Sequence, residues 1–223
     1  MEKEYRNSIG VHETIRKEMD NMSFVGIFNT MNGLIAFGDC KATRIFNDGH
    51  LEKDTKRGTI QKVFKNNKFI VVTYGNNELF SLSRLQNMED YFSEHLTPDI
   101  LYDDFFRELS FKLSYDKPEH HSGIYHFIVG AKDTDDRYYI CQVIIDAKSG
   151  KLEISEKDFQ KHCVYAGNDK YVKLFDNIPT YFDEPIDANC KRIKCQIEKM
   201  VEIFDEDPHY NPVGLPILVK MLE

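Results

Sequence analysis

The chain has 223 residues, of which 41% are hydrophobic and 30% are charged, and its 12 glycines and 7 prolines are spread along it. This composition excludes disordered, collagen-like and low-complexity proteins and is typical of a single globular core. Acidic residues outnumber basic ones by 37 to 29, and the net charge of -8 argues against nucleic-acid and anionic-membrane partners. No apolar run reaches the roughly 18–20 residues that a membrane helix needs.

The N-terminal segment and the cysteines predict where the protein resides. Residues 1–22 carry charges of both signs and lack the apolar centre of a secretory signal, so we expect a cytoplasmic protein. A thin apolar stripe within this segment predicts a weak helix over 2–20. The 5 cysteines are scattered and form no Cys-x-x-Cys pair, which argues against a disulfide framework.

Two β-hairpins are expected after this segment. The apolar runs 23–29 and 34–38 are joined through Asn32-Gly33, which is a strong hairpin signal. A polar stretch over 44–57 follows. The runs 59–65 and 68–74 are then separated by two asparagines and predict a second hairpin.

The rest of the chain alternates between helices and strands. Apolar spacing predicts a helix over 78–95 and a second from Thr97-Pro98-Asp99 to about Tyr115. Four strands are then expected, followed by two helices that open near 167–169 and at Pro185. The expected strands are 123–131, 137–146, 151–155, 162–166 and a last one over 213–222, in which Pro216 favours an edge or a bulge.

This order of elements predicts an α+β protein. Antiparallel hairpins give two sheets, and the helix pairs come in separate blocks that would cover opposite outer faces. The expected architecture is therefore a four-layer α/β/β/α sandwich of two antiparallel sheets covered by helix pairs. One sheet with helices on a single face fits the pattern almost as well.

Metal-binding motifs are weak in this sequence. His120 and His121 are adjacent, so a strand would point them to opposite faces. Cys190 and Cys195 lack zinc-finger spacing. We expect no metal.

Three polar residues stand at the ends of the first predicted strands. Ser23 opens the first strand, Asp39 ends the second and Lys62 opens the third. A hairpin brings the start of its first strand beside the end of its second, and a third strand alongside would bring Lys62 to the same end. In an unrelated α+β fold, Asp39 would instead cap a strand and Lys62 would be a solvated strand residue.

The segments Gly38-Asp39-Cys40-Lys41-Ala42-Thr43 and Gln61-Lys62-Val63 make the chain resemble the N-terminal nucleophile (Ntn) hydrolases. Within them it resembles the proteasome β-type subunit and the bacterial proteasome-like peptidase. Gly75 matches the oxyanion-hole glycine region, and residues 165–171 look like a degraded Gly-Ser-Gly segment before a helix. The resemblance extends over nearly all of 23–223, which implies one domain preceded by an extension or propeptide over 1–22.

The resemblance implies amide or peptide hydrolysis through an acyl-ester on Ser23, with the free α-amine of Ser23 as the base. Lys62, beside Asp39, would supply positive potential, and a backbone N–H near Gly75 would stabilise the oxyanion. No metal or organic cofactor is implied. The implied partners are a peptide or amide substrate, further copies in a ring or dimer and, by analogy, an ATPase.

The sequence departs from the family pattern at several positions. Serine replaces the usual threonine at 23, and Lys41 stands where the family usually has arginine or glutamine. Gly167 replaces a supporting serine. The late aspartate of the family has rough counterparts in Asp205 and Asp207.

The largest departure is the 22 residues that precede Ser23. While that peptide bond is intact, the nitrogen of Ser23 is an amide and is no base. Autocleavage after Met22, or translation from Met22 followed by methionine removal, would free the amine. Two hypotheses follow: an active Ser-type amidohydrolase, or a catalytically silent relative that serves as an assembly or binding module.

Overall fold

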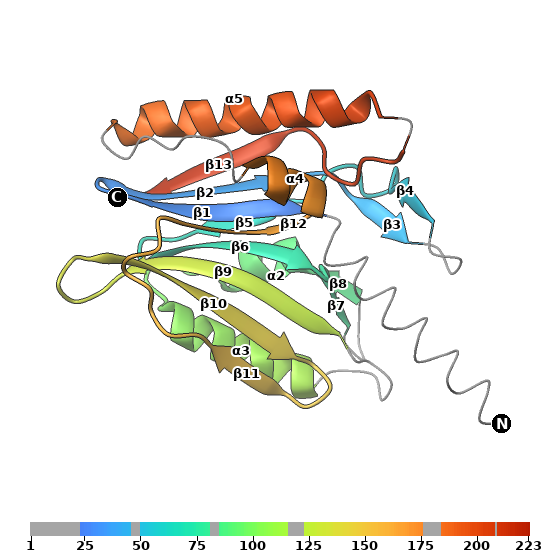
Figure 1. Cartoon of the computed structure of the whole chain (residues 1–223). Coiled ribbons are helices and arrows are strands. Elements are labelled where there is room, and N and C mark those ends of the chain that lie inside the picture. Colours follow the sequence, from blue (N-terminus) through green and yellow to red (C-terminus); the bar gives the residue numbers. More distant parts are fainter. Residues whose placement is uncertain (1–22, 46–49, 81–84, 116–122, 176–183, 208) are drawn as a thin grey trace, which may run out of the picture.

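The computed structural model describes residues 23–45, 50–80, 85–115, 123–175, 184–207 and 209–223. The helix predicted over 2–20 lies outside these residues. Two antiparallel sheets stack face to face, with α5 over one outer face and α3 over the other (Figure 1). The four-layer α/β/β/α sandwich predicted from the sequence is confirmed.

The first sheet has four strands in the order β12-β1-β2-β13, all antiparallel. Its strands are β1 (Phe24–Thr30), β2 (Gly33–Asp39), β12 (Cys163–Gly167) and β13 (Ile217–Leu222). The predicted hairpin joins β1 to β2, with Met31 and Asn32 between the paired residues Thr30 and Gly33. Gly33 has a φ of +147°, a conformation that favours glycine. The Thr30 hydroxyl closes the turn by donating to the Gly33 carbonyl at 2.7 Å.

The second sheet has five strands in the order β11-β10-β9-β6-β5. Its strands are β5 (Val63–Lys65), β6 (Phe69–Gly75), β9 (Ile124–Lys132), β10 (Tyr138–Asp146) and β11 (Lys151–Ile154). Two small hairpins lie outside the main sheets: β3 (Thr43–Ile45) with β4 (Leu51–Lys53), and β7 (Glu78–Phe80) with β8 (Leu85–Asn87).

The helices cover the sheets in two pairs. The helices are α2 (Met88–His95), α3 (Tyr102–Tyr115), α4 (Asp169–Phe175) and α5 (Ile186–Asp205). Buried side chains of α2 and α3 pack on the second sheet, and those of α4 and α5 pack on the first. Each pair of helices that is consecutive in the sequence therefore covers one sheet, as predicted.

A third apolar cluster fills the space between the sheets, and we call it the inter-sheet layer. Its fully buried members from the first sheet are Val25, Ile27, Leu34 and Ala36, and those from the second are Val63, Ile70, Val72 and Ile128. Alternation along β1 explains the split, because Phe24 and Phe28 point to the helices while Val25 and Ile27 point to the other sheet.

The predicted helix over 78–95 is wrong in its first half. The β7–β8 hairpin occupies that part of the described chain, and α2 begins only at Met88. Asn87 marks the boundary, because its side chain accepts the Asp90 N–H and caps the helix. The leucine spacing in this stretch matched a helical period, but the leucine that the structure describes as buried, Leu79, packs from a strand.

Three other boundaries differ from prediction. The helix expected from Thr97 begins at Tyr102, and the strand expected from Thr59 begins at Val63. The last strand begins at Ile217, directly after the cis Leu215–Pro216 bond. β13 is an edge strand of its sheet, which agrees with the expectation drawn from Pro216.

Candidate active site

A buried ion pair joins the two sheets at one end of the inter-sheet layer. Asp39 is the last residue of β2, and Lys62 directly precedes β5. The Lys62 ammonium lies 2.9 Å from both carboxylate oxygens of Asp39. Asp39 is fully buried and Lys62 is 2% exposed, so the two charges depend on each other for solvation.

Ser23 lies beside this pair. The β1–β2 register pairs Val25 with Gly38, so the next residues outward, Phe24 and Asp39, lie opposite each other. The Phe24 N–H donates to Asp39 Oδ1 at 2.9 Å. Ser23, one residue further, is buried with 3% of its surface exposed. The hairpin therefore brings the serine and the aspartate to the same strand end, as the sequence predicted.

Gly167 packs directly against the backbone of Ser23. A Cβ at position 167 would lie 1.7 Å from the Ser23 carbonyl oxygen, and the backbone there has a φ of +123°. The next residue, Asn168, donates its N–H to that same carbonyl at 2.8 Å. The close contact and the positive φ both favour glycine at 167, where the family pattern has a serine.

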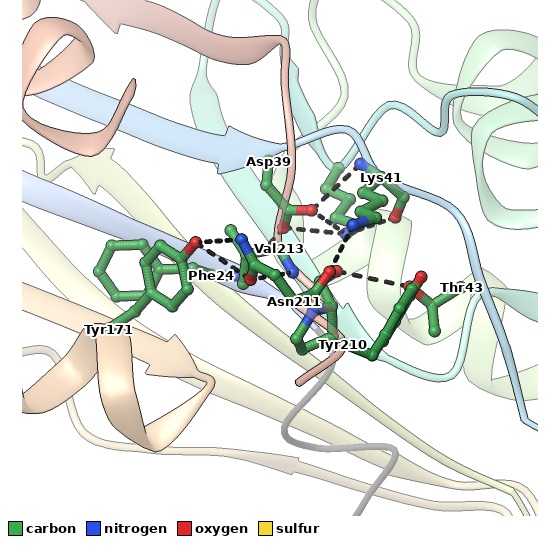
Figure 2. A network of polar contacts seen from close by, with 10 residues as sticks. Phe24, Asp39, Lys41, Thr43, Tyr171, Tyr210, Asn211 and Val213 are labelled. Atoms are coloured by element: carbon green, nitrogen blue, oxygen red, sulfur yellow. Dashed lines mark hydrogen bonds and ion pairs between the residues drawn. The ribbon is translucent and has the colours of Figure 1, made fainter. Parts of the chain in front are cut away.

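Lys41 contacts the ion pair through its backbone. Its N–H donates to Asp39 Oδ2 at 3.1 Å, and its carbonyl accepts from Lys62 Nζ at 3.3 Å. Its side-chain ammonium donates to the Asn211 carbonyl (Figure 2). The same Lys41 Nζ lies 4.6 Å from the centroid of the Tyr210 ring. Burial lowers the pKa of Lys41, while the Asp205 carboxylate opposes that shift. We call Ser23, Asp39, Lys41 and Lys62 the Asp39 cluster.

The hydrogen bonds of Lys62 occupy all of its donors. An ammonium group has three N–H bonds, and the partners here are two carboxylate oxygens and the Lys41 carbonyl. The bond to Lys41 is the longest. In this arrangement Lys62 acts on its surroundings through its charge, and a fourth acceptor would have to replace one of these three.

The remaining predicted site residues lie at different distances from the cluster. Gly75 ends β6 with a φ of +77°, two residues after Thr73, whose N–H donates to the Lys62 carbonyl at 3.0 Å. It is therefore at the same end of the second sheet as Lys62. Asp207 instead pairs with Lys170 at 3.1 Å and with His209, and the hydrogen bonds from His209 lower its pKa.

Sequence reasoning missed the residues behind the cluster. Asn211, Tyr210 and Tyr171 form a polar network with Lys41, in which Asn211 is the central residue (Figure 2). Asn211 lies in the short loop between α5 and β13, where no motif distinguishes it. An Asn-Pro pair in a loop predicts a turn, and only the packing of α4 and α5 turns it into a contact with Lys41.

The part of the chain that the structure describes holds no group of three or more His, Cys, Asp or Glu side chains placed to bind a metal ion. The helices among those residues include none that is long and apolar enough to cross a membrane.

Comparisons with known proteins place the fold. No family model matches the sequence, and no curated protein matches it. Two solved structures that match in fold are Anbu (ancestral beta-subunit) from Yersinia bercovieri and an Anbu (Gly-1) mutant from Hyphomicrobium sp. strain MC1. The first has 16% identity and a TM-score of 0.50, covering 89% of this chain and 80% of its own. The second has 15% identity and a TM-score of 0.50, covering 90% and 82%.

These neighbours correct the family assignment made from the sequence. The sequence indicated the proteasome β-type subunit and the bacterial proteasome-like peptidase, and this assignment is wrong. The structural neighbours are Anbu proteins, a related proteasome-like Ntn family. At this identity the likeness concerns the fold and not the activity. The chain therefore has the proteasome-like Ntn fold of these two neighbours.

Proposed function

We propose that this chain is an Ntn amidohydrolase that cleaves peptide or amide bonds, with Ser23 as the nucleophile. One observation supports it above the others: the buried Asp39–Lys62 pair is hydrogen-bonded to the backbone one residue from Ser23. Burying two charges is costly, and a strand end that needed only a cap would be served by a neutral side chain. A fixed positive charge near a serine favours the negative charge that develops on its oxygen during attack.

The proposed reaction has two halves. The Ser23 hydroxyl oxygen attacks the substrate carbonyl carbon while the α-amine of Ser23 takes the hydroxyl proton. The tetrahedral intermediate collapses, the C–N bond breaks, and the ammonium returns the proton to the leaving amine. Water then attacks the ester carbonyl carbon while the α-amine takes a proton from it. The bond between the acyl carbon and the Ser23 oxygen breaks, the ammonium returns the proton to that oxygen, and the carboxylic acid leaves.

Charge and backbone dipoles would lower the barriers of both halves. The positive charge of Lys62 favours the neutral form of the nearby α-amine and the developing alkoxide of Ser23. Asp39 fixes the position of this charge, because both of its carboxylate oxygens accept hydrogen bonds from the Lys62 ammonium. A backbone N–H at Gly75 is the proposed oxyanion donor, and loss of one such donor typically costs about 2.7–4 kcal/mol of transition-state stabilisation.

The mechanism requires a free amino group on Ser23. We therefore propose that residues 1–22 are an extension or propeptide and that 23–223 form the Ntn domain. The Ser23 carbonyl and the Phe24 N–H are already bonded to Asn168 and Asp39. Cleavage on the N-terminal side of Ser23 would break neither bond.

A second candidate function is a catalytically silent assembly or binding module that retains its N-terminal extension. Two observations favour it. Gly167 leaves no room for the family's supporting hydroxyl, and the Lys62 donors are all engaged within the protein. In that case the Asp39 cluster would only fix the end of the sheet.

The partner and compartment predictions stay with this proposal. A peptide or amide substrate follows from the chemistry, and a homo-oligomeric ring or dimer and an ATPase partner follow by analogy with the fold group. The cytoplasm remains the predicted compartment.

Two measurements on the full chain separate the two functions. Intact mass shows whether the purified chain starts at Ser23, and a β-lactone probe followed by peptide mapping shows whether Ser23 becomes acylated. The proposed enzyme should be processed and labelled at Ser23, and Ser23→Ala should abolish labelling. Ser110→Ala is the matched control, because Ser110 is a buried serine on α3 away from the cluster. Full-length, unlabelled protein would support the silent module.

A further inference from the structure

Asn211 is a buried amide that ties three elements together. It is 8% exposed and lies between α5 and β13. Its side-chain oxygen accepts the Val213 N–H at 3.2 Å, and its amide nitrogen donates to Asp205 Oδ1 at 2.9 Å. The Tyr171 hydroxyl lies 2.9 Å from the nitrogen and 3.1 Å from the oxygen. The amide is thus fixed by its own loop, by α4 and by the end of α5.

The backbone of the same loop contacts the Asp39 cluster. The Asn211 carbonyl accepts from Lys41 Nζ, and the Gly214 carbonyl accepts the Cys40 N–H at 3.4 Å. A Cβ at Gly214 would lie 2.7 Å from Lys41 Cδ, so the loop packs closely on the lysine stem. Lys41 is therefore held by this loop along its whole side chain.

Lys41 passes this constraint to the ion pair. Its N–H bonds to one partner, Asp39, and its carbonyl bonds to the other, Lys62. A shift of the Lys41 backbone would alter both bonds at once. The contacts run without a gap from Tyr171 and Asp205, through Asn211 and Lys41, to the charge pair.

We infer that Asn211 is a positioning residue for the Asp39–Lys62 pair, acting through Lys41. An amide suits the position because it accepts from Val213 at one end and donates to Asp205 at the other. Aspartate at 211 would place a second carboxylate against Asp205. The effect of Asn211 on catalysis rests on the proposed function, whereas its effect on the geometry of the Asp39–Lys62 pair is independent of that function.

The first test measures the pair itself in the full chain. Competitive acetylation with mass spectrometry gives the reactivity of Lys62 relative to Lys220, a half-buried lysine on β13 that reports general opening. Asn211→Asp should raise the reactivity of Lys62 on the order of tenfold relative to Lys220, as expected for loss of a coupling within one network. Asn189→Asp is the matched control, because Asn189 is also a buried asparagine but lies near the start of α5, away from Lys41, and it should change the ratio little.

A second variant covers the case in which Asn211→Asp does not fold. Lys41→Met cuts the same connection from the other side and should raise the Lys62 reactivity similarly. In the double variant the two effects should not add, because both act through one connection. If Lys62 and Lys220 react faster together, or if the effects add, Asn211 only stabilises the fold and the inference is wrong.

The second test measures the rate of Ser23 labelling by the β-lactone against probe concentration. Asn211→Asp should lower the maximal rate on the order of tenfold and leave the half-saturating concentration unchanged. If the unaltered chain is not labelled at Ser23, the proposed function fails, while the Lys62 reactivity still decides the role of Asn211.

Discussion

The middle of the inter-sheet layer and its end at the Asp39 cluster are equally buried but differ in the polarity of their side chains. In the middle, side chains such as Ile27 and Ile128 are fully buried and apolar. At the end, equally buried positions hold a carboxylate and an ammonium. Apolar side chains of similar volume would often give equal or higher stability at such positions. Burial of the charged pair is therefore no evidence that the pair makes the fold more stable than apolar side chains would.

Removal of one charge of the Asp39–Lys62 pair should change the free energy of unfolding the most. Lys62→Met leaves the Asp39 carboxylate buried without its partner and should destabilise the fold by about 3–5 kcal/mol. Urea unfolding measures this. In the middle of the layer, Ile27→Val should cost only about 0.5–1.5 kcal/mol.

The double variant Asp39→Asn/Lys62→Met sharpens this comparison. It removes both charges and keeps an acceptor for the Phe24 N–H, so it should recover much of the loss. A double variant less stable than Lys62→Met alone would show that the carboxylate stabilises the strand end without its lysine.

Two glycines test how tightly the charged end is packed. Gly167→Ala puts a methyl group against the Ser23 carbonyl and should cost about 1–3 kcal/mol for the clash. Its unfavourable φ adds a further cost of about 1–3 kcal/mol. Gly58→Ala is the matched control, because Gly58 also has a positive φ, +68°, but a Cβ there meets nothing within 4 Å. Equal urea midpoints for the two variants would contradict the close packing at Ser23.

Alkaline pH should weaken the charged end. Burial, with the negative charge of Asp39 as the second cause, raises the pKa of Cys40 from 9.0 to about 11. The folded chain therefore keeps this proton where the unfolded chain loses it. Its contribution to stability is complete below pH 9.0 and is lost as the pH rises through about 11.

Urea unfolding across that pH range measures the effect, and Cys40→Ala should make the fall shallower. Cys195→Ala is the control, because its thiol is exposed in the folded chain. An unchanged slope in Cys40→Ala would contradict the assignment of this proton to Cys40.

The smallest effect is expected on the rate of Ser23 labelling when one of two carboxylates near Asn211, Asp205 or Asp207, is replaced. Asp205 holds the Asn211 amide, whereas Asp207 pairs with Lys170 and with His209, which is exposed. Asp205→Asn should therefore slow Ser23 labelling, and Asp207→Asn should leave it nearly unchanged, since exposed ion pairs contribute little. Slower labelling in Asp207→Asn would instead support the role predicted for Asp207 from the sequence.

Much of the fold was predictable because local signals and tertiary packing agree. The Asn32-Gly33 turn fixes the β1–β2 register, and that register alone places Asp39 opposite Phe24. The β7–β8 hairpin was missed because its leucines repeat at a helical spacing, although Asn87 followed by Asp90 gives a helix-start signal inside the segment.

The site was predictable only where it lies on strands. Ser23, Asp39 and Lys62 stand at strand ends, so the strand order brings them to one edge. Asn211 and Tyr171 meet Lys41 through the packing of a loop and two helices, and no spacing in the sequence encodes that contact. The family assignment drawn from the segments 38–43 and 61–63 was wrong, because two short segments do not separate related families. The match in fold to the two Anbu structures covers 89% and 90% of the chain.

Two hydrogen bonds hold the main chain at Ser23 in place. The peptide group that follows it is fastened on both sides, by Asn168 to its oxygen and by Asp39 to its nitrogen. Neither bond involves the Ser23 nitrogen, so the start of β1 is tied to its neighbours downstream of whatever that nitrogen carries.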